Sequence, residues 1–283
     1  MKRFREKGMQ AVFLICACIS IAAVIWICKF IFANGIPAIS KIGFKNFIFG
    51  MIWKPNQNLF GIFPMIVSSI YVTLGAVIIG APVGILTAVY LSCYCPKVLY
   101  RIIKPMVNLL ASVPSIIYGF FFLVAVVPII QKITHTSGKG ILTASILLGV
   151  MILPTIINTA ESSIRAVPDN YYEGSLALGA TKERVVFKTI IPAASSGILS
   201  GVILGIGRAI GETMAVIMII GNQAIIPSSI TSGVRTLTGN IVIEMAYASG
   251  LHREALIATA VVLFVFILII NLLFSVLAKR RAR

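Results

Sequence analysis

The chain has 283 residues, of which 59% are hydrophobic and only 11% are charged. Soluble domains contain roughly 25% charged residues, so this composition excludes an ordinary soluble domain and indicates a polytopic membrane protein. The formal net charge of +16 could indicate nucleic acid or anionic lipid as a partner. However, the Lys and Arg residues lie in short clusters between apolar runs, which is the pattern of topology signals. We therefore expect membrane lipid around the chain and no nucleic acid.

Six segments have the length of a membrane-spanning helix, which needs about 20 mostly apolar residues. They are residues 11–32, 65–91, 105–130, 141–160, 197–221 and 255–278. These segments predict an all-α polytopic membrane protein with six transmembrane helices. An even number of spans places both termini on the same side of the membrane.

The first apolar run follows a basic N-terminus, as a secretory signal would. It is longer than a signal, ends at Lys29 and Phe30, and has no convincing small-residue cleavage site. We therefore expect it to be retained as a helix. Three of the five cysteines lie in this run, and the other two, Cys93 and Cys95, have no His or second Cys pair nearby. Neither a metal site nor a disulfide is expected.

Lys and Arg predict the orientation, because they are more frequent in cytoplasmic segments. With the N-terminus inside, the inside segments carry about twice as many of these residues as the outside segments. The inside residues are Lys2, Arg3, Arg5, Lys7, Lys97, Arg101, Lys104, Arg165, Lys182, Arg184, Lys188, Lys279, Arg280, Arg281 and Arg283. The outside residues are Lys41, Lys45, Lys54, Lys132, Lys139, Arg235 and Arg253. Both termini are expected in the cytoplasm, with the chain in a bacterial or archaeal plasma membrane.

This orientation makes residues 161–196 the largest cytoplasmic loop. Outside, aromatic residues and glycines punctuate residues 34–63 and suggest a folded interfacial segment, and residues 223–253 form the other long loop. We divide the chain into residues 1–64, with the first helix and the external segment, and residues 65–283, a five-helix core that contains the cytoplasmic loop.

The cytoplasmic loop is expected to contain a short helix. Pro168 and Asp169 are favourable residues at a helix start, and Gly179 is favourable at a stop. A second helix is expected over residues 181–190, before Pro192. A short helix that lies parallel to the membrane can transmit force to a partner.

The loop resembles the EAA loop of importer-type ABC permeases. Glu173, Gly179 and Pro192 stand at the spacing of that motif. Gly174 and Ser175 replace its two alanines, and a further departure is Thr189 at a usually aliphatic position. The resemblance implies that this loop, from Glu173 to Gly179, supplies the helix that docks into a groove of a cytoplasmic ATPase subunit. An ordinary amphipathic connector is the alternative.

The chain has no phosphate-binding loop of its own. Residues 137–140 lack both the upstream glycine spacing and the Ser or Thr after the lysine that a Walker A sequence requires. We therefore expect no enzymatic activity, so that ATP hydrolysis comes from another subunit.

The fifth predicted span carries two charged residues, Arg208 and Glu212. Because they are four residues apart, they share one face of a helix and can pair. An arginine near the middle of a membrane costs roughly 2.5 to 3.5 kcal/mol and usually faces a bundle interior or a water-filled cavity. We predict that both residues line a path for a charged solute; the alternative is a neutralised pair that only fixes helix packing.

Glycines on the same span form two small-residue faces. Gly197, Gly201 and Gly205 form one face, and Gly207 and Gly211 form the other. Small faces permit close contact between helices. We expect one of them to meet a second membrane subunit.

Several segments closely resemble phosphate-importer permeases, specifically the PstC family. They are residues 207–216 followed by Gly221 and Asn222, residues 61–64, 82–85, 90–92 and 114–120. The resemblance covers nearly the whole chain after the first helix. It implies a MetI-like all-helical permease without a cofactor. It also implies four kinds of partner: a PstA-type permease subunit in a heterodimer, two ABC ATPase subunits, an external phosphate-binding protein, and phosphate itself.

The resemblance and the charged residues together suggest a mechanism. Movement of the docking helix would alternate access to a path past Arg208, whose guanidinium Glu212 would hold at rest. An arriving phosphate could replace Glu212 through a bidentate contact, and a protonated phosphate oxygen could donate to Glu212. Ser115 and Tyr118 are weaker candidates for lining the path, and for them helix packing is the favoured interpretation.

Three other functions remain as alternatives. A permease for sulfate or molybdate would have the same architecture, although the motif around Arg208 argues against it. An ion-coupled secondary carrier would need inverted repeats and paired broken helices, and the sequence indicates neither. A membrane scaffold or sensor would leave Arg208 unexplained.

Overall fold

The computed structural model describes residues 2–281, which form a helical bundle with one small β-hairpin. The elements are α1 (Lys2–Ile42), α2 (Phe44–Phe49), β1 (Trp53–Lys54), the 3-10 turn η1 (Pro55–Gln57), β2 (Leu59–Phe60), α3 (Phe63–Val89), the π-helix η2 (Tyr90–Tyr94), α4 (Lys97–Ser112), α5 (Ser115–Phe121), the π-helix η3 (Phe122–Val126), α6 (Val127–Thr134), α7 (Ile141–Arg165), α8 (Asp169–Ala177), α9 (Lys182–Val185), the π-helix η4 (Val186–Ile190), α10 (Ile191–Ala193), α11 (Ser195–Gly211), α12 (Met214–Ile219), α13 (Leu237–Met245) and α14 (Gly250–Arg281). Arg283, one of the cations used to predict orientation, lies outside the described residues.

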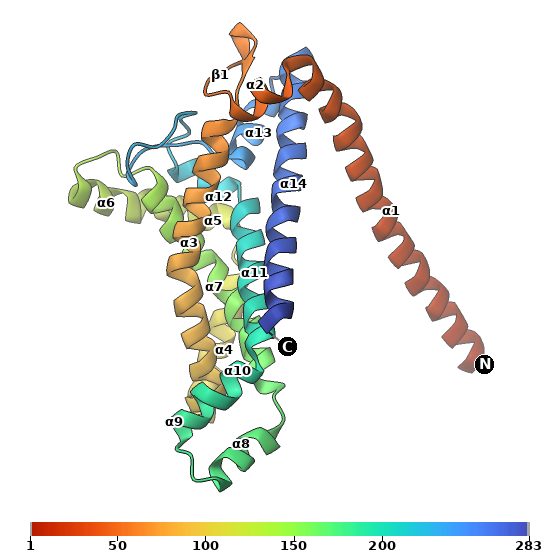
Figure 1. Ribbon diagram of the computed structural model, residues 1–283, viewed down its shortest axis with the longest axis vertical. Helices are drawn as coiled ribbons and strands as arrows, with labels where there is room; N and C mark the ends of the chain where they lie inside the picture. The colour runs from red at the N-terminus through yellow and green to blue at the C-terminus, as the bar shows by residue number, and fades with distance from the viewer. Residues whose placement is uncertain (1, 282–283) are drawn as a thin grey trace.

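Helices α3 and α7 pack along each other at the centre of the bundle, and α11 packs against both (Figure 1). A Cβ atom on Gly80 would lie 2.7 Å from the carbonyl oxygen of Gly149, and one on Gly84 would lie 2.8 Å from Cγ2 of Ile156. Lipid chains are as apolar as the helices, so membrane helices associate mainly through close packing of small residues. These glycines therefore allow α3 and α7 to approach closely enough to form the core.

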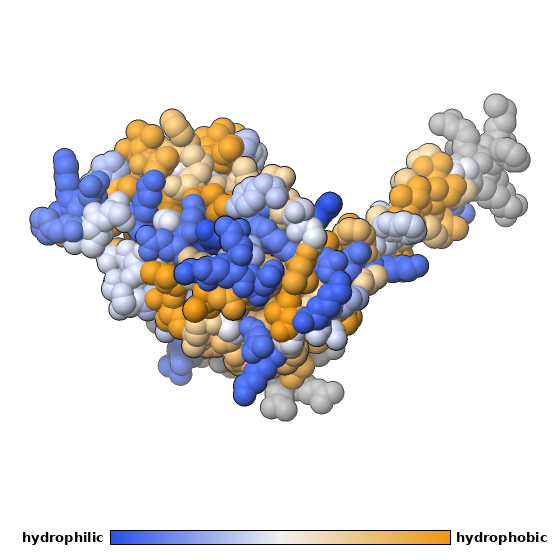
Figure 2. Space-filling model, turned by 90° about the horizontal axis from the view of Figure 1, so that it is seen from above, coloured by the Kyte–Doolittle hydropathy of each residue, from blue (hydrophilic) through white to orange (hydrophobic). Residues whose placement is uncertain are grey.

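The two ends of the bundle differ, and we call them the α8 end and the hairpin end (Figure 1). At the hairpin end, β1 and β2 pair antiparallel with Trp53 opposite Phe60. The side chains of Phe47, Trp53 and Phe60 are buried there with Leu256 of α14. The expected folded segment within residues 34–63 is therefore present. Figure 2 views this end and shows hydrophilic side chains across its centre, with hydrophobic side chains around them and along α1.

Helix α1 leans away from the bundle and contacts α14 near its own C-terminal end (Figure 1). Phe32 packs edge to face on Phe264 with 5.7 Å between the ring centroids. Residues 8–27 are exposed throughout, although they are strongly apolar. From the hairpin end, α1 and α14 both extend in the direction of the α8 end (Figure 1).

The all-α, multi-pass architecture predicted from the sequence is confirmed. Five segments of the described chain are long and apolar enough to cross a membrane: Gly8–Ile42, Phe63–Tyr94, Ser115–Thr134, Ile141–Arg165 and Gly250–Leu273. The count becomes six when the pair Lys182–Ala193 and Ser195–Gly211, bent by 66°, is taken as one span.

The third predicted span, residues 105–130, was wrong as a single helix. The chain there forms α4 and then α5, with Val113 and Pro114 extended between them. A proline disfavours helical backbone in the residue before it and lacks an N–H group. Pro114 therefore divides this part of the chain into two helices.

The fifth predicted span, residues 197–221, was also wrong as a single helix. Helix α11 ends at Gly211, Glu212 is extended, and α12 begins at Met214. The loop expected at residues 161–196 is shorter than predicted, because α7 continues to Arg165. Glu161 is therefore helical and buried rather than part of a solvated loop.

Candidate functional site

The short helix predicted in the loop is α8, which lies apart from the bundle at one end (Figure 1). Glu173 is exposed on it, and a Cβ atom on Gly174 would meet nothing within 4 Å. Gly179 has a φ of 81°, in the left-handed region that favours glycine. The predicted stop at Gly179 is thus confirmed. This face of α8 is therefore uncovered by the described part of the chain.

The second predicted helix is also present, as α9 followed by η4. Its N-cap is Thr181, whose hydroxyl accepts a hydrogen bond from the backbone N–H of Arg184 at 3.4 Å. The helical path continues past Pro192 through α10, and the 66° bend follows at Ala194. Proline is tolerated at the first positions of a helical segment, where its missing N–H needs no partner.

Both polar departures from the EAA pattern lie together in the structure. The hydroxyl Oγ of Ser175 on α8 lies 3.2 Å from Oγ1 of Thr189 on η4. Ser175 also donates to the carbonyl of Tyr171 at 2.8 Å. The hydroxyl pair joins α8 to the helix that leads back into the bundle, where alanine and an aliphatic residue could not form a hydrogen bond.

Arg208 is half-buried on α11. Its Nη1 donates to Oγ1 of Thr155 on α7, at 3.3 Å. No carboxylate lies within ion-pair distance of Arg208 in the part of the chain that the structure describes. The guanidinium therefore keeps most of its hydrogen-bonding capacity.

Glu212 does not pair with Arg208, and the expectation that they share a continuous helix face was wrong. Glu212 occupies the break between α11 and α12. Its Oε1 accepts hydrogen bonds from the backbone N–H groups of Thr213 at 3.1 Å and Ala215 at 3.3 Å. The carboxylate thus satisfies free N–H groups at the start of α12, which favours a negative charge there.

The two weaker candidates lie near another break. Ser115 begins α5, and Tyr118 donates its hydroxyl to the carbonyl of Leu110 at 2.8 Å. This bond connects α5 to α4 across the Pro114 break. For Tyr118, helix packing is therefore what the geometry supports.

The glycine faces differ in their surroundings. Gly197, Gly201 and Gly205 face α7, where added Cβ atoms would lie 2.0 Å from Oγ of Ser163, 3.1 Å from Cβ of Thr159 and 3.1 Å from Cγ1 of Ile156. In contrast, a Cβ atom on Gly207 or Gly211 would meet nothing within 4 Å. The face of Gly197, Gly201 and Gly205 therefore packs on α7 within this chain. The face of Gly207 and Gly211 is uncovered by the described residues.

Sequence reasoning missed a buried carboxylate network centred on Glu161. Its oxygens accept hydrogen bonds from Tyr100 at 2.7 Å, Lys104 at 2.6 Å and Arg165 at 2.9 Å. The bond to Glu161 raises the pKa of the Tyr100 phenol. Arg165 also donates to the carbonyl of Leu91 at 3.0 Å. The spacing of Glu161 and Arg165, four residues apart, was the available signal.

A second missed network lies at the hairpin end around Glu244. Its carboxylate is bonded by Arg235 at 2.5 Å, by Trp53 at 2.8 Å and by His252 at 2.8 Å. Arg235 also donates to the carbonyl of Asn222 at 2.9 Å. These contacts join the hairpin to the segment after α12. No local pattern in the sequence connects residues so far apart.

Helix α7 physically links the two candidate regions. Thr155 contacts Arg208, Glu161 holds the buried network, and Arg165 ends the helix shortly before α8. Ten residues of α-helix span about 15 Å. The path-lining candidates therefore lie inside the bundle, while the candidate docking residues lie at its α8 end.

The sequence of this chain is similar to the sequences of known transport proteins. The sequence profile of a family described as binding-protein-dependent transport system inner membrane component matches residues 80–283. A probable ABC transporter permease protein, YqgH of Bacillus subtilis, is 33% identical over 94% of this chain and 88% of its own length. The phosphate transport system permease protein PstC of Mesorhizobium japonicum is 33% identical over 85% of this chain and 80% of its own length.

Solved structures of ABC importers share the fold. The inward-facing MetNI methionine transporter has a chain that aligns with a TM-score of 0.64 at 22% identity, over 82% of this chain and all of that one. A bacterial alginate transporter in complex with its periplasmic protein aligns with a TM-score of 0.60 at 17% identity, over 98% of both chains. At these identities the likeness establishes the fold alone.

Proposed function

Because this chain belongs to the binding-protein-dependent transport system inner membrane component family and is similar to phosphate permeases, we propose that it is the permease subunit of an importer of inorganic phosphate. Members of this family are multi-pass permease subunits of ABC importers and have no enzymatic activity of their own. An ATPase subunit and a binding protein work with such a permease. Our proposal adds the identity of the cargo, the identity of the partner permease and the orientation of the chain in the membrane.

The observation that carries the proposal is the guanidinium of Arg208. An arginine inside the apolar part of a bundle costs roughly 2.5 to 3.5 kcal/mol on insertion scales and faces a partner or a water-filled path. Arg208 has only the hydroxyl of Thr155 as a hydrogen-bond acceptor among the described residues. An oxyanion that presents two oxygens would complete this site through a bidentate contact.

Glu212 gives the site a preference for an anion that carries a proton. Oε1 is used for the N–H groups of α12, and Oε2 has no hydrogen-bond partner in the described part of the chain. At neutral pH phosphate carries a proton that it can donate to a carboxylate oxygen, whereas sulfate does not. In this proposal Glu212 accepts a proton from phosphate, whereas the sequence suggested that it pairs with Arg208 at rest.

The α8 loop couples the path to ATP hydrolysis in the same proposal. Glu173, Gly174, Ser175 and Gly179 form the surface that enters the groove of an ATPase subunit, and Pro192 precedes the bend into α11. The open face of Gly207 and Gly211 would meet the PstA-type subunit of a heterodimer. Both termini and α8 would lie in the cytoplasm, and the hairpin end would face the phosphate-binding protein.

The proposed division of the chain follows the same roles. Residues 1–64 form an anchoring helix and an external segment, and residues 65–283 form the permease core.

The structure contains helices broken at Pro114 and at Glu212. The sequence did not indicate these breaks, and secondary carriers also use broken helices. Membership of the ABC permease family argues against a secondary carrier.

Uptake of radiolabelled phosphate tests the proposal. Cells that lack this chain would be complemented with the native sequence, Arg208→Gln, Glu212→Gln or the control Arg101→Gln, which removes an exposed guanidinium from α4. We expect native and control chains to restore uptake at low external phosphate, and the two other variants to reduce it at least tenfold, as the loss of about 1.4 kcal/mol would.

Assembly with the ATPase would be checked by co-purification of each variant. Phosphate uptake that does not depend on this chain would refute phosphate as the cargo, and sulfate and molybdate would be measured in the same cells. Full uptake with Glu212→Gln would refute only the role of that carboxylate as a proton acceptor.

A further inference from the structure

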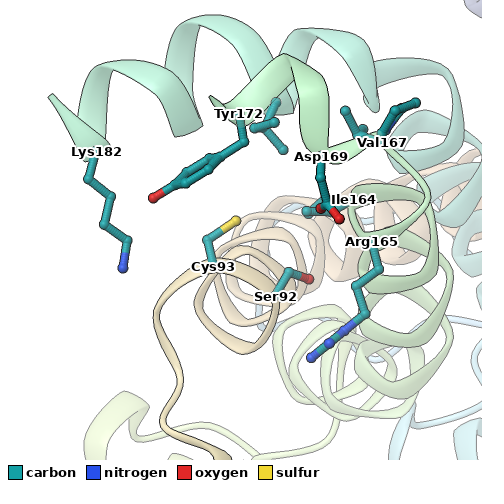
Figure 3. Close-up of a pocket in the computed structure, with 10 residues that line it drawn as sticks. Ser92, Cys93, Ile164, Arg165, Val167, Asp169, Tyr172 and Lys182 are labelled. Carbon is teal, nitrogen blue, oxygen red and sulfur yellow. The ribbon is translucent and has the colours of Figure 1, made fainter. Parts of the chain in front are cut away.

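A polar cavity of about 340 Å³ lies between α8 and the adjoining ends of α3 and α7 (Figure 3). We call it the α8 pocket. Its polar lining consists of Ser92, Cys93, Arg165, Asp169, Tyr172 and Lys182. None of these residues has a role in the motif that identifies the docking loop. The pocket therefore requires its own explanation.

The hydroxyl of Ser92 is the first indication of a ligand. Its Oγ is buried and has no hydrogen-bond partner among the described residues. Ser92 belongs to the π-helix η2, and π-helical turns frequently occur at functional sites. A buried hydroxyl left without a partner is unfavourable, so a bound polar group that reaches it would be stabilised.

Two cations border the pocket on opposite sides, with Ser92 between them (Figure 3). Lys182 lies over the ring of Tyr94, with Nζ 4.9 Å from the centroid, and has no carboxylate partner in the described chain. Arg165 uses Nε for Glu161 and Nη2 for the carbonyl of Leu91. Its Nη1 donates to none of the described residues, although the guanidinium lies over the ring of Tyr100, 4.6 Å from the centroid. Both cations therefore retain donors for an anion.

The lining combines hydrogen-bond donors, cations and one carboxylate. The hydroxyl groups of Ser92 and Tyr172 and the ammonium of Lys182 can donate to the oxygens of a bound anion, and Arg165 adds a positive charge on the side opposite Lys182. Asp169 is the only carboxylate in the lining, and it can accept a proton-bearing oxygen. We propose that the α8 pocket binds a phosphoryl anion, with a protonated oxygen directed at Asp169.

Binding there would restrain the docking helix. Asp169 and Tyr172 belong to α8, whereas Ser92 follows α3 and Arg165 ends α7. An anion held in the pocket between these elements would tie α8 to the core. A high cytoplasmic concentration of phosphoryl anions would then oppose the movement of α8 and slow import. The anion is either free inorganic phosphate or the phosphoryl group of a lipid.

Radiolabelled inorganic phosphate binding to the purified transporter complex in nanodiscs tests this site. All samples carry Arg208→Gln, which removes the proposed cargo site, and contain neither ATP nor the external binding protein. Lys182→Gln is compared with Lys188→Gln, which removes an exposed ammonium from the adjacent η4. We expect Lys182→Gln to raise the Kd about tenfold, as loss of one charge-assisted hydrogen bond does, and Lys188→Gln to leave it unchanged.

Two further arms identify the ligand. Asp169→Asn should reduce the preference for phosphate over sulfate, and Ser92→Ala should weaken phosphate binding. Phosphate is first bound in nanodiscs that contain phosphatidylcholine alone, and phosphatidic acid is then added. If phosphatidic acid displaces the bound phosphate, the ligand is a lipid headgroup. If it does not, the ligand is free phosphate. Equal binding by Lys182→Gln and Lys188→Gln would overturn the proposal. Since cargo is measured by uptake and the pocket by binding, either proposal can fail alone.

Discussion

At the scale of single residues, one buried carboxylate connects three parts of the chain. Glu161 of α7 is 2% exposed and binds Tyr100 and Lys104 of α4. Through Arg165 it also reaches the carbonyl of Leu91, where α3 passes into the pocket region. A buried charge is tolerated only when its partners and hydrogen bonds are complete. The network therefore fixes the base from which α8 extends.

Removing this carboxylate should destabilise the protein severely. Glu161→Ala leaves the ammonium of Lys104, which is 24% exposed, without its anion. Loss of one partner costs about 3–5 kcal/mol in fully buried pairs, which is the upper limit here. For a chain of this size we expect a fall in Tm on the order of 10 °C, measured by size-exclusion chromatography after heating. Glu183→Ala, at an exposed position of α9, should leave Tm nearly unchanged. An equal Tm for both variants would contradict the structural role of Glu161.

The hydroxyl pair Ser175 and Thr189 should couple energetically. Each of Ser175→Ala and Thr189→Val removes the same hydrogen bond, worth about 0.5–1.5 kcal/mol. We expect each variant to change the rate of ATP-dependent import by a similar factor, and the double variant to be no worse than either. Fully additive effects in this double-mutant cycle would show that the two hydroxyls act independently.

At the scale of elements, small residues and helix breaks decide which faces meet. Gly201 and Gly205 bring α11 onto α7, while Gly207 and Gly211 remain uncovered. The break at Glu212 redirects the chain into α12, which packs on α5 through the close approach of Gly119 to Ala215. One helix thus supplies an internal contact and an open face.

Leucine substitutions separate these two faces. Gly201→Leu would place a side chain against Thr159, where an added Cβ already lies at 3.1 Å, and overpacking of this kind costs about 1–3 kcal/mol. We expect it to lower the Tm of the isolated chain. Gly207→Leu should leave that Tm unchanged but reduce co-purification of the partner permease. Equal destabilisation of the isolated chain by both would show that the second face is not free.

At the scale of the whole molecule, the two ends of the bundle contain different structural features. The α8 end holds the proposed docking helix, the Glu161 network and the α8 pocket. The hairpin end is held together by Glu244, which binds Trp53, Arg235 and His252. In the proposed orientation, the first end meets the ATPase and the second receives the cargo from outside.

Cysteine labelling tests this orientation directly. Leu178, which is 90% exposed beside α8, and Asn56, exposed in the hairpin, offer positions at the two ends. In a chain whose native cysteines are replaced, an impermeant maleimide applied to intact cells should label Asn56→Cys and spare Leu178→Cys. Inside-out vesicles from which the ATPase has been stripped should give the opposite result. Labelling of Leu178→Cys in intact cells would reverse the proposed topology.

Residue chemistry alone predicted the class of protein and the position of the short helix α8. Long apolar runs must be helical in a bilayer because their backbone groups have no other partners, so composition and span length were sufficient for an all-α membrane fold. The helix start at Asp169 and the stop at Gly179 followed from local backbone preferences, which do not depend on the rest of the fold.

Tertiary structure decided what the charged residues do. Arg208 and Glu212 looked like a pair because spacing assumes a continuous helix, but the break at Gly211 turns Glu212 toward the N–H groups of α12. The contact of Ser175 with Thr189 and the burial of Glu161 depend on how separate helices approach one another. Such contacts depend on how helices pack in three dimensions, and neither local propensity nor residue spacing predicts that packing.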